Sequence, residues 1–102
     1  MGDEDQPTAS VVRPKVEGTR YACPCCRHLT LDERGGYEIC PVCFWEDDGQ
    51  DDLDADRVRG GPNGELSLAQ ARRNYAAWSA CEERFKQHVR PPLPSEKVDG
   101  RQ

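Results

Sequence analysis

Six cysteines carry the most specific chemical signal in this sequence, and four of them form two matching motifs. Cys23-Pro24-Cys25-Cys26 and Cys40-Pro41-Val42-Cys43 both read C-P-x-C. Two residues between cysteines let one tight turn bring both sulfurs to the same ion, and proline fixes φ in that turn. Two such knuckles supply four soft sulfur ligands, which suit tetrahedral Zn²⁺. We therefore predict one zinc ion held by Cys23, Cys26, Cys40 and Cys43. Iron on the same sulfurs, and buried or disulfide-bonded cysteines, are the alternatives.

A site filled by four sulfurs leaves no position for substrate or water, so the predicted role of the metal is structural. Two nearby residues keep other possibilities open. Cys25 is an alternative ligand to Cys26 or a reactive thiol, and we expect it to be a partly covered thiol beside the metal. His28 is another possible ligand, although we expect it to be exposed on a strand. Cys81, far along the chain, is expected to be a small buried hydrophobe.

The residues between the knuckles predict how the two halves of the site meet. Leu29–Leu31 and Tyr37–Ile39 both resemble short strands, and the segment between them contains Gly35-Gly36. This order predicts a β-hairpin that returns the second knuckle to the first. The arrangement is that of a zinc ribbon.

The clearest helix signal covers about residues 67–80. Ser67 is a candidate N-cap, with Gln70 completing a capping box. Apolar residues then recur at steps of three and four along one face, at Leu68, Ala71, Tyr75 and Trp78. We expect Phe44 and Trp45, which follow the last ligand, to pack on Tyr75 and Trp78. A solvent-facing aromatic binding patch is the alternative.

The composition predicts a single small α+β domain that depends on its metal. Of 102 residues only 16 are Leu, Ile, Val or Phe, which is below the roughly 20% at which folding driven by a core becomes doubtful. We expect a zinc-ribbon-like domain over residues 20–90, with its two knuckles packed on a C-terminal helix, and disordered tails at 1–19 and 91–102. No apolar run could span a membrane. The acidic start lacks a secretory signal, which favours the cytoplasm.

An acidic run follows the second knuckle. Seven carboxylates lie within residues 46–56: Glu46, Asp47, Asp48, Asp51, Asp52, Asp54 and Asp56. The spacing fails the calcium-loop pattern, since Arg57 stands where glycine is needed and Asn63 where glutamate is needed. We expect a solvated or partner-facing loop, in which some carboxylates cap a turn or pair with Arg57 and Arg59. A second metal ion is the alternative.

With these motifs in view, the chain resembles the bacterial cysteine-rich CPCC family. The resemblance rests on the two knuckles together with five short segments. These are Leu29–Leu31, Phe44–Asp48, Gly60–Asn63, Leu66–Leu68 and Ala71-Arg72. It covers roughly residues 20–92. The resemblance implies a small bacterial metal-binding domain and does not indicate an activity.

Three classes of function fit the sequence. The favoured one is a non-enzymatic, zinc-stabilised module that binds a protein partner through its acidic loop and aromatic surface. A nucleic-acid-binding ribbon is the second; the net charge of −5 disfavours it, although Arg72, Arg73 and Arg84 could form a local patch. The third is a thiol-redox or metal-dependent enzyme that uses Cys25, or the acidic run with His28 or His88.

Overall fold

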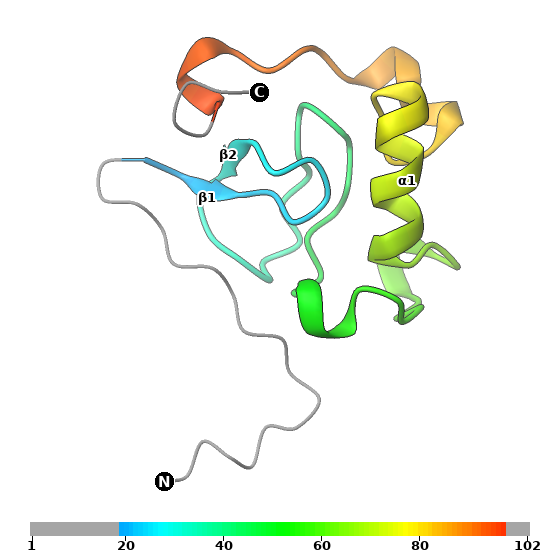
Figure 1. Cartoon of the computed structure of the whole chain (residues 1–102). Coiled ribbons are helices and arrows are strands. Elements are labelled where there is room, and N and C mark those ends of the chain that lie inside the picture. Colours follow the sequence, from blue (N-terminus) through cyan, green and yellow to red (C-terminus); the bar gives the residue numbers. More distant parts are fainter. Residues whose placement is uncertain (1–18, 98–102) are drawn as a thin grey trace, which may run out of the picture.

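The chain reverses direction twice, once at each knuckle, and these two turns form the centre of the molecule. One helix packs beside them (Figure 1). The computed structural model describes residues 19–97. Almost all of the predicted 1–19 tail and residues 98–102 lie outside these residues. Within residues 19–97, no helix is long and apolar enough to cross a membrane. The elements in chain order are β1 (Tyr21–Ala22), β2 (Leu29–Leu31), the 3₁₀ turns η2 (Asp52–Asp54) and η3 (Gly61–Asn63), α1 (Leu68–Trp78), and the 3₁₀ turns η4 (Glu83–His88) and η5 (Pro94–Glu96).

The strand pairing differs from the predicted hairpin. β2 pairs antiparallel with β1, which lies on the other side of the first knuckle. Ile39 forms a single antiparallel bridge with Glu46 across the second knuckle. The prediction that 29–31 pairs with 37–39 is therefore wrong. Each knuckle already reverses the chain, so the residues flanking it are the nearest partners. Tyr37 also has φ of 63°, which interrupts an extended strand there. The result is a two-stranded sheet beside one main helix, a small α+β arrangement.

Helix α1 begins where the capping signal predicts. The Ser67 hydroxyl accepts a hydrogen bond from the Gln70 backbone N–H at 3.0 Å. The Gln70 side chain donates to Asn74 instead of returning to Ser67, so we find only half of the predicted capping box. Leu68 and Ala71 are fully buried against the knuckles. The helix ends at Ser79, which adopts a left-handed conformation and donates its N–H to the Tyr75 carbonyl.

The aromatic residues after the second knuckle separate to two sides of the chain. Trp45 is fully buried in the core, with Tyr75 packed against the same cluster. Phe44 instead packs on η4, with ring centroids 4.6 Å from Phe85 and 5.3 Å from His88. Phe44 has φ of 73°, so the backbone between the two side chains is a turn and not extended chain. Trp78 is 37% exposed, and its predicted packing with Phe44 and Trp45 stays a prediction.

The segment after η4 returns to the hairpin instead of trailing away. Residues 91–97 cross the molecule and place η5 beside β2 (Figure 1). Glu96 is buried and accepts two hydrogen bonds from the Arg90 guanidinium, at 2.9 and 2.8 Å. Its carboxylate also accepts the Leu93 N–H at 2.8 Å. The described part of the predicted 91–102 tail is thus an ordered closing segment.

This closing segment predicts a pH dependence. Hydrogen bonds from Arg90 lower the pKa of Glu96 below its ordinary value. A lowered pKa gives stability that is present above the unfolded pKa, about 4.3 for glutamate, and lost as pH falls through the folded pKa. We expect Glu96→Gln to unfold about 1–3 kcal/mol more easily than wild type near pH 7, and the difference to shrink below about pH 4. Urea unfolding of both proteins across this range measures it. A constant difference would contradict the assignment.

Candidate metal centre

Four buried cysteine sulfurs from the two knuckles converge on one point. The ligand atoms of Cys23, Cys26, Cys40 and Cys43 all lie within 4.8 Å of one another. Sγ of Cys23 is 3.6 Å from Sγ of Cys43, and Sγ of Cys26 is 3.7 Å from Sγ of Cys40. Metal–sulfur bonds of about 2.3 Å at tetrahedral angles require sulfurs about 3.8 Å apart, whereas a disulfide bond is about 2.05 Å long. The spacing therefore fits four ligands around one ion, and all six cysteines are free.

The two knuckles have the same backbone structure. In the first, the Arg27 N–H donates to the Cys23 carbonyl at 2.7 Å. In the second, the Phe44 N–H donates to the Cys40 carbonyl at 2.8 Å. Arg27 and Phe44 have φ of 72° and 73°, a left-handed conformation that is unusual for residues other than glycine. Each knuckle thus closes with the same turn, and the two pairs of sulfurs meet at one centre.

Of the four sulfurs, that of Cys40 is surrounded by the hydrogen-bond donors that best stabilise a thiolate. The Thr30 hydroxyl lies 3.1 Å from its sulfur, and the Val42 N–H donates to it at 3.4 Å. Hydrogen bonds from Cys23 and Cys26 lower the pKa of Cys40 well below its ordinary value. Burial raises the pKa values of Cys23 and Cys43. A bound divalent cation would offset this burial cost and hold all four sulfurs as thiolates, so the donor set fits a divalent metal ion.

The other sulfur and imidazole candidates are also buried. Cys25 is 4% exposed and Cys81 is 1% exposed, and both belong to the core. Burial of Cys81 is the predicted result, and burial raises the pKa of its thiol. His28 is only 4% exposed, so its expected place on the surface is wrong. Its carbonyl accepts the Cys23 N–H at 2.8 Å, which draws the residue inward.

His28 and Trp45 occupy equivalent places after the two knuckles. The Cys40 N–H donates to the Trp45 carbonyl at 3.0 Å, as the Cys23 N–H does to His28. Both rings are buried, and His28 Nδ1 and Trp45 Nε1 have no hydrogen-bond partner among the described residues. Sequence reasoning missed this relation, although both residues stand two positions after the second cysteine of a knuckle.

The acidic run is largely an internal structure. Asp47 and Asp51 are buried around the guanidinium of Arg34. Arg34 donates to Asp47 at 2.9 Å, to Asp51 at 2.7 Å and to the Gln50 carbonyl at 2.7 Å. Burial alone would lower the pKa of Arg34, but its bonds to Asp47 and Asp51 outweigh burial and raise the pKa. We call this group the Arg34 clasp; it ties the spacer between the knuckles to the loop after them.

Two further carboxylates of the run are buried beside the clasp. Asp54 pairs with Arg59 at 3.1 Å, and Asp51 caps η2. Both contacts agree with the expectation that some of these carboxylates cap a turn or pair with Arg57 and Arg59. Asp48 accepts the Gln50 N–H at 3.1 Å. The partner-facing prediction is therefore wrong for Asp47, Asp48, Asp51 and Asp54. It stays a prediction for half-buried Glu46 and for exposed Asp52 and Asp56.

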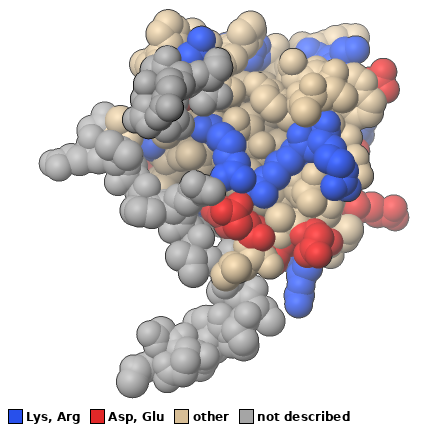
Figure 2. Space-filling model, viewed as in Figure 1, with Lys and Arg blue, Asp and Glu red and all other residues tan. Residues whose placement is uncertain are grey.

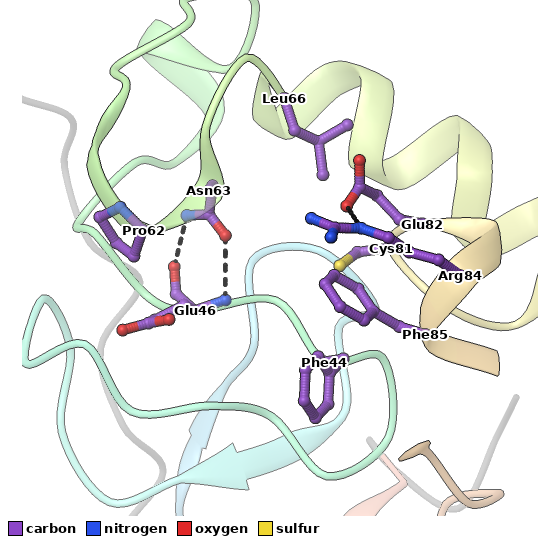
Figure 3. A pocket seen from close by; sticks show the side chains of 9 residues that line it. All are labelled: Phe44, Glu46, Pro62, Asn63, Leu66, Cys81, Glu82, Arg84 and Phe85. Atoms are coloured by element: carbon purple, nitrogen blue, oxygen red, sulfur yellow. Dashed lines mark hydrogen bonds and ion pairs between the residues drawn. The ribbon is translucent and has the colours of Figure 1, made fainter. Parts of the chain in front are cut away.

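Glu46 is held through its backbone. The Asn63 side chain accepts the Glu46 N–H at 3.3 Å and donates to the Glu46 carbonyl at 2.7 Å (Figure 3). The two bonds fix η3 against the chain that leaves the second knuckle. A small pocket beside them is lined by Leu66, Phe85 and the Cys81 sulfur. This contact holds the Gly60–Asn63 motif against Glu46, although Asn63 and Glu46 are 17 positions apart in the sequence.

The predicted arginine patch is mostly neutralised. Arg72 donates to the Pro24 carbonyl and pairs with Asp52 at 2.9 Å. Arg84 pairs with Glu82 at 2.8 Å. On the face shown in Figure 2, a band of Lys and Arg side chains lies above a group of Asp and Glu side chains. Phosphate binding gains little from cations that already have carboxylate partners.

The fold and the cysteine cluster define a small α+β domain with four clustered cysteines that could hold a metal ion. The chain belongs to the cysteine-rich CPCC family, whose family model matches residues 21–96. That range begins at β1 and ends at Glu96, so it includes the closing segment. A search of curated proteins and a search of solved structures each found no match to the chain.

Proposed function

We propose that this protein is a zinc-stabilised, non-enzymatic interaction module, and that its single zinc ion is structural. The observation that carries the proposal is the cluster of four buried sulfurs, which would fill a tetrahedral coordination sphere around one ion. Sulfur ligands favour zinc over the hard divalent ions, and iron is the less favoured occupant. Six free cysteines suit a reducing compartment, so the proposal places the domain in the cytoplasm.

Cobalt substitution tests whether the site is closed. Co²⁺ is bound in place of the native metal, and its visible absorption bands report the geometry and ligands. A closed four-sulfur site gives a tetrahedral spectrum that added cyanide or imidazole leaves unchanged. A shift of the bands on addition of either molecule would show an open coordination position, and the structural role would be wrong.

The burial of two candidate residues favours the interaction function over the enzyme alternatives. Cys25 and His28 are each 4% exposed, which leaves little of either residue for contact with a substrate, whereas His88 is exposed. Four carboxylates of the acidic run are buried, and two of these are held by Arg34. The proposal therefore assigns the function to the surface, where a partner protein would bind exposed side chains supported by the zinc-held scaffold.

The hydroxyl of Thr30 is expected to tune the metal site. Its contact with the Cys40 sulfur is 3.1 Å long and buried. Thr30→Val keeps the shape of the side chain and removes the hydrogen bond, and such outer-shell changes typically cost about 10–100-fold in metal affinity. Competition with a chromophoric chelator measures the loss. Thr19→Val, at a half-buried position outside the cysteine cluster, is the matched control. Equal affinities of the two variants would contradict the role of Thr30.

A further inference from the structure

A groove at the end of α1 has no part in the metal centre. Its volume is about 320 Å³, and it lies between the helix end and the chain that follows η4. Tyr75 and Trp78 line it from the helix, Val42 from the second knuckle, and Pro91 and Pro92 from the closing segment. Trp78 is 37% exposed, a large aromatic surface for a side chain that proteins normally cover. Aromatic and proline walls of this kind accept an apolar side chain.

The groove is also positive on an otherwise acidic protein. Lys86 and Arg90 line it, and none of the described lining residues is aspartate or glutamate. Arg90 is matched by Glu96, whereas Lys86 has no ion pair within residues 19–97. The whole chain carries a net charge of −5. An unmatched ammonium beside an apolar wall therefore selects a ligand that combines an apolar group with a carboxylate.

We propose that this groove binds an acidic peptide segment of a partner protein, with an apolar side chain against Trp78 and a carboxylate at Lys86. The proposal rests on the proposed interaction function and names the partner's chemistry and the surface that receives it. A nucleic acid fits less well. A single unmatched lysine offers little to a row of phosphates, and the net charge of the protein repels them.

Fluorescence anisotropy with synthetic peptides tests the chemistry of the ligand. The probe is a labelled twelve-residue peptide of alternating aspartate and leucine, added to the full zinc-loaded chain. One control peptide replaces every aspartate by asparagine, and another replaces every leucine by serine. We expect each control to bind at least about tenfold more weakly, because each removes one of the two features. Equal binding of all three peptides would overturn the proposal.

Protein variants locate the binding site. Trp78→Ser and Lys86→Glu are each expected to weaken the aspartate–leucine peptide about tenfold or more. Arg73→Glu is the matched control, since it makes the same charge change at an exposed position of α1 outside the groove lining. We expect it to stay within about twofold of wild type. A loss as large as that of Lys86→Glu would show a general charge effect and overturn the site.

The remaining outcomes separate this inference from the proposed function. A labelled single-stranded oligonucleotide that binds more tightly than the peptide overturns the choice of a protein ligand. A second copy of this chain could also supply the ligand, because Leu53 is 72% exposed and follows Asp52, which gives an apolar side chain beside a carboxylate. If the chain self-associates and Leu53→Ser abolishes this, the proposal of a partner protein is overturned in favour of a second copy. If the peptide fails to bind while the zinc-loaded chain remains folded with a closed site, the groove assignment fails and the structural role of the metal stands.

Discussion

Replacing Cys43 by alanine is expected to unfold the domain and abolish metal binding. Cys43 is fully buried, and its sulfur is one of the four that meet at the centre. Binding of a structural zinc ion contributes on the order of 10 kcal/mol to folding, and the whole stability of a domain this size is about 5–15 kcal/mol. Loss of one ligand therefore removes most of what holds the chain together. Circular dichroism and metal content of the purified variant measure both effects.

Cys81→Ala is the matched control for this experiment. Cys81 is as buried as Cys43, but its sulfur lies outside the cluster of four. Its removal leaves a small cavity beside Leu66 and Phe85, for which we expect a cost of about 1 kcal/mol and no loss of metal. If the Cys43 variant were folded and as stable as the Cys81 variant, the four-cysteine centre would not be what stabilises this fold.

Replacing Arg34, the centre of the Arg34 clasp, is expected to give the second large loss of stability. The Arg34 side chain is 6% exposed, and Asp47 and Asp51, its partners, are 0% and 2% exposed at their side chains. Arg34→Met preserves much of the apolar stem and leaves two buried carboxylates without their cation. Removing one partner of a buried pair costs about 3–5 kcal/mol. Urea unfolding of the zinc-loaded protein at pH 7 is expected to show a loss of that size.

Two comparisons make the clasp result specific. Arg84→Met removes a cation whose side chain is 75% exposed, and should change stability by less than about 0.5 kcal/mol. Adding Asp47→Asn and Asp51→Asn to Arg34→Met is expected to restore part of the loss, because the uncompensated charges disappear. A loss below about 1 kcal/mol for Arg34→Met would mean that the buried carboxylates do not need their partner.

The features that could be predicted from the sequence are those set by short-range rules. The C-P-x-C spacing determines which sulfurs can meet, and the four predicted ligands do converge. Ser67 and the apolar steps after it predict α1 closely, because a cap and a helical period are local properties. The strand pairing failed because two and three residues carry almost no periodicity. In addition, each knuckle is itself the turn of a hairpin.

The burial of the acidic run could not be predicted from its composition. Seven carboxylates in eleven residues suggest a solvated loop. The loop is largely buried instead because Arg34, 13 positions before Asp47, binds two of its carboxylates. Arg90 and Glu96 show the same effect in the closing segment, where prolines suggested a tail. In both cases an ion pair formed by tertiary folding decides burial, and no local pattern reports it.

Native mass spectrometry with and without a chelator tests the central claim most directly. We expect one zinc ion per chain in the folded protein. A strong chelator should remove the ion, and the charge-state distribution should then shift to that of an unfolded chain. Restoring one equivalent of zinc should return the folded distribution. A chain that keeps its folded distribution after the metal is gone, or that folds without ever binding one, would contradict the account.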